Sequence, residues 1–337
     1  MADIIGATPE EQAAIIGGGA GMRPVLADNA SGLLANNAAF DMAVNATLRK
    51  DEWEIIDERV NEEARRRLTV LELFRSRGLI QPVSIGDIER VTERLDAFTS
   101  AEVTFDGEVE AQKDRPNYRT DRRAVPIVSK GFDIGWRQLA SSERRGNNLQ
   151  VDSAGLAGRA VAHRMQNLIT NGLATGGPDG GGLPGLTTAP DRIEVSIGTD
   201  WLASGADPVG NVEAMLEAAY TNFLFGPFVL MIPRNYWAAV QGDYSALKGD
   251  RTFLERFQAF PDIDQVVPND ALTNGNVLLV QMTRDVADIS LAQDLTTWQW
   301  QKTPAKTHFR VLMVGGPHIK SIQTESGTTV NGIVHLS

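Results

Sequence analysis

The chain has 337 residues, of which 42% are hydrophobic and 22% are charged, enough apolar material for one large or two modest cores. It contains no cysteine, which excludes disulfides, thiolate metal sites and a cysteine nucleophile. The formal net charge of −11 argues against a surface that grips nucleic acid, because phosphate contacts need clustered Lys and Arg. An acidic protein can still enclose nucleic acid that it does not bind tightly.

The sequence has no recognisable targeting or membrane segment. Its start lacks the basic residues of a signal peptide, and no apolar run approaches the roughly 18 residues that cross a bilayer. We therefore expect a protein that is made in a cytoplasm and does not enter a membrane.

Residues 1–49 are rich in Ala, Gly and Asn and include the run Gly17-Gly18-Gly19-Ala20-Gly21. Such a stretch buries too little apolar surface on its own to offset the entropy of ordering it. The composition predicts an arm that becomes ordered on another surface. Residues 51–77 follow with an apolar stripe at helical spacing, which predicts one helix ended by Gly78 at its C′ position.

Residues 98–137 alternate between polar and apolar positions around a polar stretch at 112–123. This pattern predicts a long two-stranded hairpin with an acidic outgoing limb and a basic incoming limb. An isolated hairpin is marginal in water, so we expect it to lie on another surface.

The second half of the chain reads as a long helix followed by a compact α/β unit. Residues 151–171 have a buried stripe and end in Asn171-Gly172, before a glycine-rich turn at 176–185. Residues 207–300 then alternate short helices and strands, among them a buried strand at Phe228–Ile232 and two strands at Ile289–Ala292 and Thr297–Gln301. The strand at Thr307–Val314 is followed by two short segments, Ile319–Gln323 and Gly332–Leu336, that suggest a terminal hairpin.

Motifs that would carry enzyme chemistry are weak. Gly180 to Gly185 satisfies G-x-G-x-x-G, but a helix precedes it and Pro184 opposes a helix after it, so a turn is favoured over a nucleotide site. Asp262 and Asp264 fit a solvated loop better than a cation site. His163 fits a solvated or subunit-contact position better than a general base.

Two further groups of residues are compatible with packing. Trp298 and Trp300 alternate along a predicted strand, where core or interface packing is favoured over a ligand-stacking platform, since Lys302 is the one basic neighbour in sequence. Glu143, Arg144 and Arg145 form a charge run that is either solvated or part of an ion-pair network between subunits.

The order of these elements resembles the Hong Kong 97-like fold of tailed-phage major capsid proteins and encapsulin shell proteins. The resemblance is most specific over residues 51–186. It is carried by Asp51-Glu52-Trp53-Glu54-Ile55-Ile56-Asp57, by Arg122-Arg123-Ala124-Val125-Pro126-Ile127-Val128, by Phe132-Asp133-Ile134 and Arg137-Gln138-Leu139, and by Met165–Gly172 with Gly185-Leu186. The arm is longer than encapsulins usually carry, which favours a phage capsid protein.

The resemblance implies an α+β fold with six segments. These are an N-terminal arm (1–49), an N-terminal helix with the start of the P-domain (50–96) and an extended E-loop hairpin (97–137). A P-domain part with the spine helix (138–200), an A-domain (201–299) and P-domain return strands (300–337) follow. Lys113 and Lys130 are the lysines of the hairpin, and no partner for a crosslink is matched.

The resemblance also implies a structural protein of a virion, assembled in the host cytoplasm without a cofactor, metal or catalytic site. Its copies would form hexamers and pentamers of an icosahedral shell that encloses DNA without sequence-specific binding. Separate scaffolding, portal or decoration proteins are further partners. An encapsulin-like compartment is the alternative, and a nucleotide-binding enzyme is a remote one. Candidate contacts between subunits are the charged residues Glu108, Glu110, Lys113, Arg115, Arg119, Arg122, Arg123, Glu143, Arg144 and Arg145.

Overall fold

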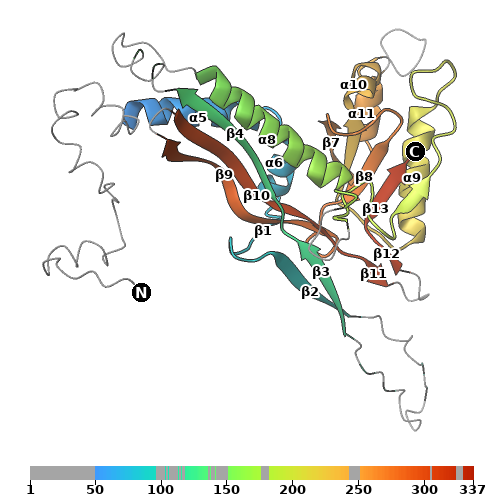
Figure 1. Cartoon of the computed structure of the whole chain (residues 1–337). Helices are drawn as coiled ribbons and strands as arrows, with labels where there is room; N and C mark the ends of the chain where they lie inside the picture. Colours follow the sequence, from blue (N-terminus) through green and yellow to red (C-terminus); the bar gives the residue numbers. More distant parts are fainter. Residues whose placement is uncertain are drawn as a thin grey trace, which may run out of the picture.

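The structure is a computed structural model of the whole chain (Figure 1). It describes residues 50–95, 103, 105, 113, 115, 118–135, 137, 141, 151–175, 182–242, 251–303, 306–323 and 329–337. The predicted N-terminal arm, the hairpin tip and the charge run at 143–145 therefore lie outside the described residues. Among the described residues, no helix is both long enough and apolar enough to cross a membrane.

Three helices cover one face of a large sheet. They are α5 (Lys50–Arg65), α6 (Thr69–Ser76) and α8 (Val151–Asn171). The single helix predicted over 51–77 is broken at residues 66–68, yet its apolar stripe is buried on both sides of the break, from Ile56 to Leu71. Gly78 has a φ of +67°, so the prediction that it ends this helical segment is confirmed.

The large sheet has the strand order β1-β9-β10-β4. Its strands are β1 (Ile80–Pro82), β9 (Ala287–Thr303), β10 (Lys306–Ile319) and β4 (Ile127–Gly135). Two strands predicted at 289–292 and 297–301 are one continuous strand, β9, because it pairs with β10 along its whole length. Phe309, Val311 and Met313 alternate toward the helices and are buried in the main core.

A second sheet has the order β5-β13-β8-β6-β7. Its strands are β5 (Ile193–Val195), β13 (Ile333–Leu336), β8 (Val277–Gln281), β6 (Phe228–Pro233) and β7 (Ile263–Asn269). Helices α9 (Pro208–Thr221), α10 (Arg234–Val240) and α11 (Phe253–Gln258) pack beside it. All six residues of β6 are buried, since alternate residues enter the main core and the core beneath these helices.

Two parts of this sheet differ from the sequence prediction. Asp262 and Asp264 were expected in a solvated loop, but residues 263–269 form β7, which pairs in parallel with β6. The C-terminal segment was expected in a terminal hairpin. Instead, β13 pairs with β5 and β8 in the five-stranded sheet. The short pair β11 (Ile322–Gln323) and β12 (Thr329–Val330) precedes it. A short apolar segment does not reveal which strand it pairs with, because the partner comes from a distant part of the chain. The sequence therefore could not predict either difference.

A buried polar network joins the helical part to the second sheet. Gln166 on α8 donates to Thr69 at 3.0 Å and to Asn269 on β7 at 3.1 Å, and Asn269 donates to Thr170 at 3.0 Å. Gln166, Thr170 and Asn269 are almost fully buried. Because buried polar groups need their hydrogen-bond partners, this network fixes how β7 sits against the helix.

A two-stranded ribbon leaves the body below the large sheet in Figure 1. It consists of β2 (Glu89–Leu95) and β3 (Tyr118–Ala124), paired antiparallel from Glu89 opposite Ala124 to Leu95 opposite Tyr118. The predicted hairpin over 98–137 is therefore displaced at both ends. Its outgoing strand begins at Glu89, and residues 127–135 leave the ribbon after Pro126 to pair with β10.

Candidate assembly surfaces and the root of the ribbon

The two faces of the ribbon differ. Directly opposite residues of an antiparallel pair share a face, so Arg90, Arg123, Thr92 and Asp121 lie together on the face that meets the body. Val91 and Arg122 are opposite each other on the other face, and both are exposed. With Ile88 and Tyr118, Val91 leaves large apolar side chains more than half exposed on or beside a two-stranded ribbon. Such exposed apolar surface is typical of an association site.

The structure places the predicted contact residues unevenly. Arg122 is exposed on the outward face, whereas Arg123 faces the body. Lys113 and Arg115 are described and exposed, and the backbone of Arg119 lies in β3 opposite Arg94. The others lie outside the described residues: Glu108, Glu110, Glu143, Arg144 and Arg145. The predicted acidic-to-basic pairing falls largely outside them as well, and in the described ladder Arg90 is opposite Arg123, a like-charge pair.

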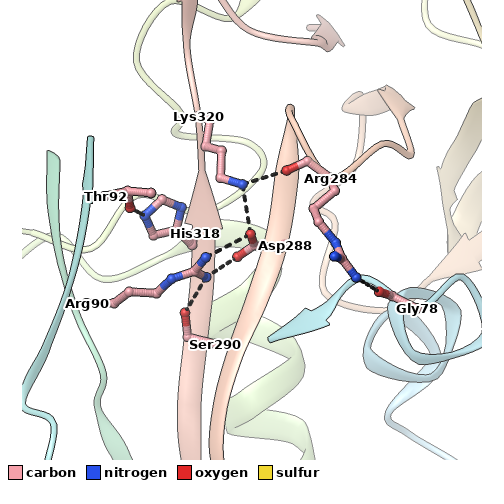
Figure 2. A network of polar contacts seen from close by, with 8 residues as sticks. All are labelled: Gly78, Arg90, Thr92, Arg284, Asp288, Ser290, His318 and Lys320. Atoms are coloured by element: carbon pink, nitrogen blue, oxygen red, sulfur yellow. Dashed lines mark hydrogen bonds and ion pairs between the residues drawn. The ribbon is translucent and has the colours of Figure 1, made fainter. Parts of the chain in front are cut away.

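The root of the ribbon is defined as Arg90, Thr92, Arg123, Asp288, Ser290, His318 and Lys320. It is a polar and charged cluster around the buried Asp288, Ser290 and His318, and Figure 2 shows all of its members except Arg123. Asp288 on β9 is 2% exposed and pairs with Arg90 of the ribbon. Arg90 also donates to Ser290 at 3.0 Å. Lys320 donates to the second carboxylate oxygen of Asp288 at 2.9 Å and to the carbonyl of Arg284 at 2.5 Å. One carboxylate thus holds two cations from different parts of the chain.

His318 on β10 completes the link between ribbon and sheet. Its Nε2 lies 2.5 Å from the hydroxyl oxygen of Thr92, and the residue is 1% exposed. Burial lowers the pKa of His318 to about 4; Asp288 opposes this shift, while Arg90, Lys320 and Arg123 add to it. The ring is therefore neutral near pH 7, and the ribbon is tied to the body by a network that already carries excess positive charge.

Another surface is the outer face of the large sheet near the β9–β10 turn. Trp298 and Trp300 are 48% and 43% exposed, opposite Arg310 and His308 of β10. The Trp300 ring stacks on His308 with centroids 5.7 Å apart, and His308 Nδ1 lies 2.6 Å from a carboxylate oxygen of Asp133. Arg310 and His308 on β10 are thus neighbours of the two tryptophans. The sequence did not reveal this, because they lie on the paired strand.

An apolar loop lies at the end of α9. Phe223 and Phe225 are 75% and 62% exposed, and Phe223 has a φ of +59°. The hydroxyl of Tyr220 donates to Asp262 beside this loop, and that hydrogen bond raises the pKa of Tyr220 to about 12. The loop is a second exposed apolar surface, on the lobe that carries the five-stranded sheet.

The structure gives the enzyme-like motifs other roles. A Cβ on Gly185 would lie 2.2 Å from the Gly172 nitrogen, so Gly185 permits close contact with the end of α8. Residues 186–192, directly after it, form turns and not a helix, which agrees with the predicted turn. Asp264 pairs with Arg77, so the predicted loop carboxylates have protein partners. His163 is exposed, and within the described residues no group of three His, Asp or Glu side chains could hold a metal.

The sequence analysis missed the residues of the ribbon root because they are scattered over 230 positions of the chain. One signal was present: Asp288 interrupts an otherwise apolar stretch, Val286-Ala287-Asp288-Ile289. A carboxylate in such a stretch needs a cation partner when buried. Nothing in the sequence indicated that Arg90 and Lys320 would supply it.

The two-lobed α+β architecture with a projecting ribbon is the Hong Kong 97-like fold. A virus-like particle from Pyrococcus furiosus has a TM-score of 0.58 at 16% identity, with 84% of this chain and 98% of that chain covered. The capsid of Myoviridae phage XM1 also has a TM-score of 0.58, at 13% identity and 77% and 90% coverage. These likenesses confirm the predicted fold class.

The chain itself belongs to the family described as "family of unknown function (DUF6260)", whose model matches residues 37–330. A curated relative is the type 1 encapsulin shell protein EncA of Myxococcus xanthus (strain DK1622). It is 24% identical over 276 residues, which cover 79% of this chain and 88% of the relative.

Proposed function

We propose that this protein is the structural subunit of a closed protein shell, as a major capsid protein of a tailed-phage type. The observation that carries the proposal is the ribbon. Its outward face exposes Val91 and Tyr118, and it is held to its own body at one end by the polar cluster. A projecting element with exposed apolar residues gains most by lying on a neighbouring copy.

The proposed shell has hexamers and pentamers of this chain around DNA that it does not bind sequence-specifically. In the subunit, residues 1–49 are the N-terminal arm, and the E-loop, expected at 97–137, is the β2–β3 ribbon from Glu89 to Ala124 with its tip. Helices α5, α6 and α8 with the large sheet are the P-domain, which includes β9 from Ala287 although the A-domain was expected to extend to residue 299. The lobe with α9, α10 and α11 is the A-domain, which includes β13 from the expected return strands. The Phe223–Phe225 loop then belongs to the A-domain surface. Scaffolding, portal or decoration proteins are separate partners, and the particle is a virion assembled in the host cytoplasm.

An encapsulin-like compartment is the second candidate. The similarity to the encapsulin shell protein of Myxococcus xanthus over 79% of this chain favours it. The two candidates share the shell and differ in the contents. Native particles purified from the source organism separate them: packaged DNA supports a capsid, and an enclosed protein without DNA supports a compartment. Both candidates are structural proteins and not enzymes, in keeping with the relatives.

Assembly can be tested at the ribbon with Val91→Asp, which places a charge in the exposed apolar face. We expect the concentration needed for assembly to rise about tenfold or more, because one lost apolar contact recurs at every subunit interface. The conservative variant Val91→Ile serves as the control and should assemble as the unaltered chain does. Negative-stain microscopy and sedimentation velocity measure the outcome.

The test has a clear adverse result. If the unaltered full-length chain stays a monodisperse monomer at high concentration, the shell proposal is wrong. If shells form but Val91→Asp assembles at the same concentration as Val91→Ile, the ribbon does not carry the assembly contact.

A further inference from the structure

The charge balance at the root of the ribbon is uneven. Arg90, Arg123 and Lys320 are three cations, and Asp288 is the carboxylate that pairs with two of them. Asp121 lies on the same ribbon face, opposite Thr92, but forms no ion pair with the cluster among the described residues. The cluster therefore has less negative than positive charge. This imbalance is unfavourable, because burying a cation without a matching anion costs free energy.

Arg123 is the residue that is short of a partner. It lies directly opposite Arg90 in the β2–β3 ladder, so the two guanidinium groups share the face that meets the body. Arg90 has Asp288 and Ser290 as acceptors. The Nε of Arg123 is buried without a hydrogen-bond partner among the described residues, although the residue as a whole is partly exposed. Because the residue is partly exposed, a group from outside can contact its side chain, although the Nε atom itself is buried.

His318 adds a second unpartnered polar atom to the same cluster. Its Nε2 contacts Thr92, while its Nδ1 is buried with no partner in the described part of the chain. When the Thr92 hydroxyl donates to Nε2, the proton of the neutral ring is on Nδ1, which then needs an acceptor. Arg123 and His318 belong to the same cluster, since the charge of Arg123 is among those that lower the pKa of His318.

We propose that the root of the ribbon is a binding site for an oxyanion, a carboxylate or a phosphate, held by Arg123 with Lys320 and Arg90 nearby. Such a group supplies the negative charge that the cluster lacks and accepts from the Arg123 guanidinium in a charge-assisted hydrogen bond. Two sources offer this chemistry: a free inorganic anion, or an acidic side chain of a neighbouring copy. The second source rests on the proposed shell; the site itself does not.

Binding is tested with inorganic phosphate titrated into full-length, unassembled protein by calorimetry, at constant ionic strength set with chloride. We expect saturable binding that weakens about tenfold or more in Arg123→Gln, the effect of one lost charge-assisted hydrogen bond. Arg122→Gln is the matched control, because the adjacent side chain points to the opposite ribbon face and is exposed. It should bind phosphate like the unaltered chain, so general salt effects cancel.

A second measurement needs no variant. Phosphate should protect Arg123, and not Arg122, from modification by phenylglyoxal, as mapped by mass spectrometry. The assembled particle then distinguishes the sources: unchanged phosphate affinity indicates a free anion, and lost affinity indicates that a neighbouring carboxylate occupies the site. Absence of phosphate binding, or equal binding and equal modification of the two arginines, overturns the proposal. That result would leave the shell proposal standing, since assembly is measured separately.

Discussion

Replacing Asp288 with Asn tests the physical basis of the ribbon root. The side chain is 3% exposed and is the shared partner of Arg90 and Lys320, the latter at 2.9 Å. Asn keeps the size and one acceptor oxygen but removes the charge, so two cations lose their counter-ion in a buried setting. Breaking a buried ion pair by removing one partner costs about 3–5 kcal/mol. We expect Asp288→Asn to lower the free energy of unfolding by about 3 kcal/mol, because the amide oxygen retains part of the hydrogen bonding.

The assay is urea unfolding of unassembled full-length protein, followed by circular dichroism. The matched control is Asp285→Asn, the same chemical change at an exposed carboxylate three residues earlier, which should alter stability by less than about 0.5 kcal/mol. Arg90→Gln and the double variant complete a cycle that isolates the Arg90–Asp288 interaction. If Asp288→Asn is as stable as Asp285→Asn, the cluster does not hold the ribbon to the body as described.

Three further predictions concern other sites. The pKa of His318 is lowered from 6.5 to about 4, so below pH 6.5 the unfolded chain binds a proton that the folded chain does not. The free energy of unfolding should therefore fall toward pH 4 by on the order of 3 kcal/mol. His318→Gln should remove this fall in urea unfolding measured at several pH values, and an unchanged pH profile would refute the prediction. Gly185→Ala should lower the free energy of unfolding by about 3 kcal/mol or more, since a Cβ there would lie 2.2 Å from the Gly172 nitrogen. A variant with the same midpoint of thermal unfolding as the unaltered chain would contradict this prediction. Asn269→Leu should cost about 2–3 kcal/mol, because one N–H of the buried Gln166 amide loses its acceptor and the buried Thr170 hydroxyl loses its donor. A neutral effect in urea unfolding would mean that this polar link is dispensable.

Local pattern predicted the elements whose burial is one-sided. The stripe of α8 and the ends of that helix follow from residues three and four positions apart, and they are confirmed. Gly78 at the end of α6 was predictable for the same reason, since only the local backbone decides where a helix stops. The buried run Phe228–Ile232 also indicated its own strand.

Elements whose identity depends on a distant partner were misjudged. Asp262 and Asp264 are typical of a solvated loop, but residues 263–269 form β7, which has β6 as a parallel partner, and Asn269 joins the buried network at α8. The incoming limb of the hairpin passes through Pro126 into β4, which leaves the ribbon to pair with β10. Trp298 and Trp300 gained basic neighbours only through cross-strand register with Arg310 and His308.

The sequence by itself determined the class of elements, the apolar content of the two cores, the absence of cysteine chemistry and the turn role of Gly185. These depend on composition, on periodicity and on residues close in the chain. Only the tertiary structure decided that Arg90, Arg123, Asp288, His318 and Lys320 meet at the ribbon root. These residues are far apart in the sequence, whereas electrostatic attraction depends on their distance in space. Their pairing, and the shortage of negative charge beside them, therefore follow from the fold alone.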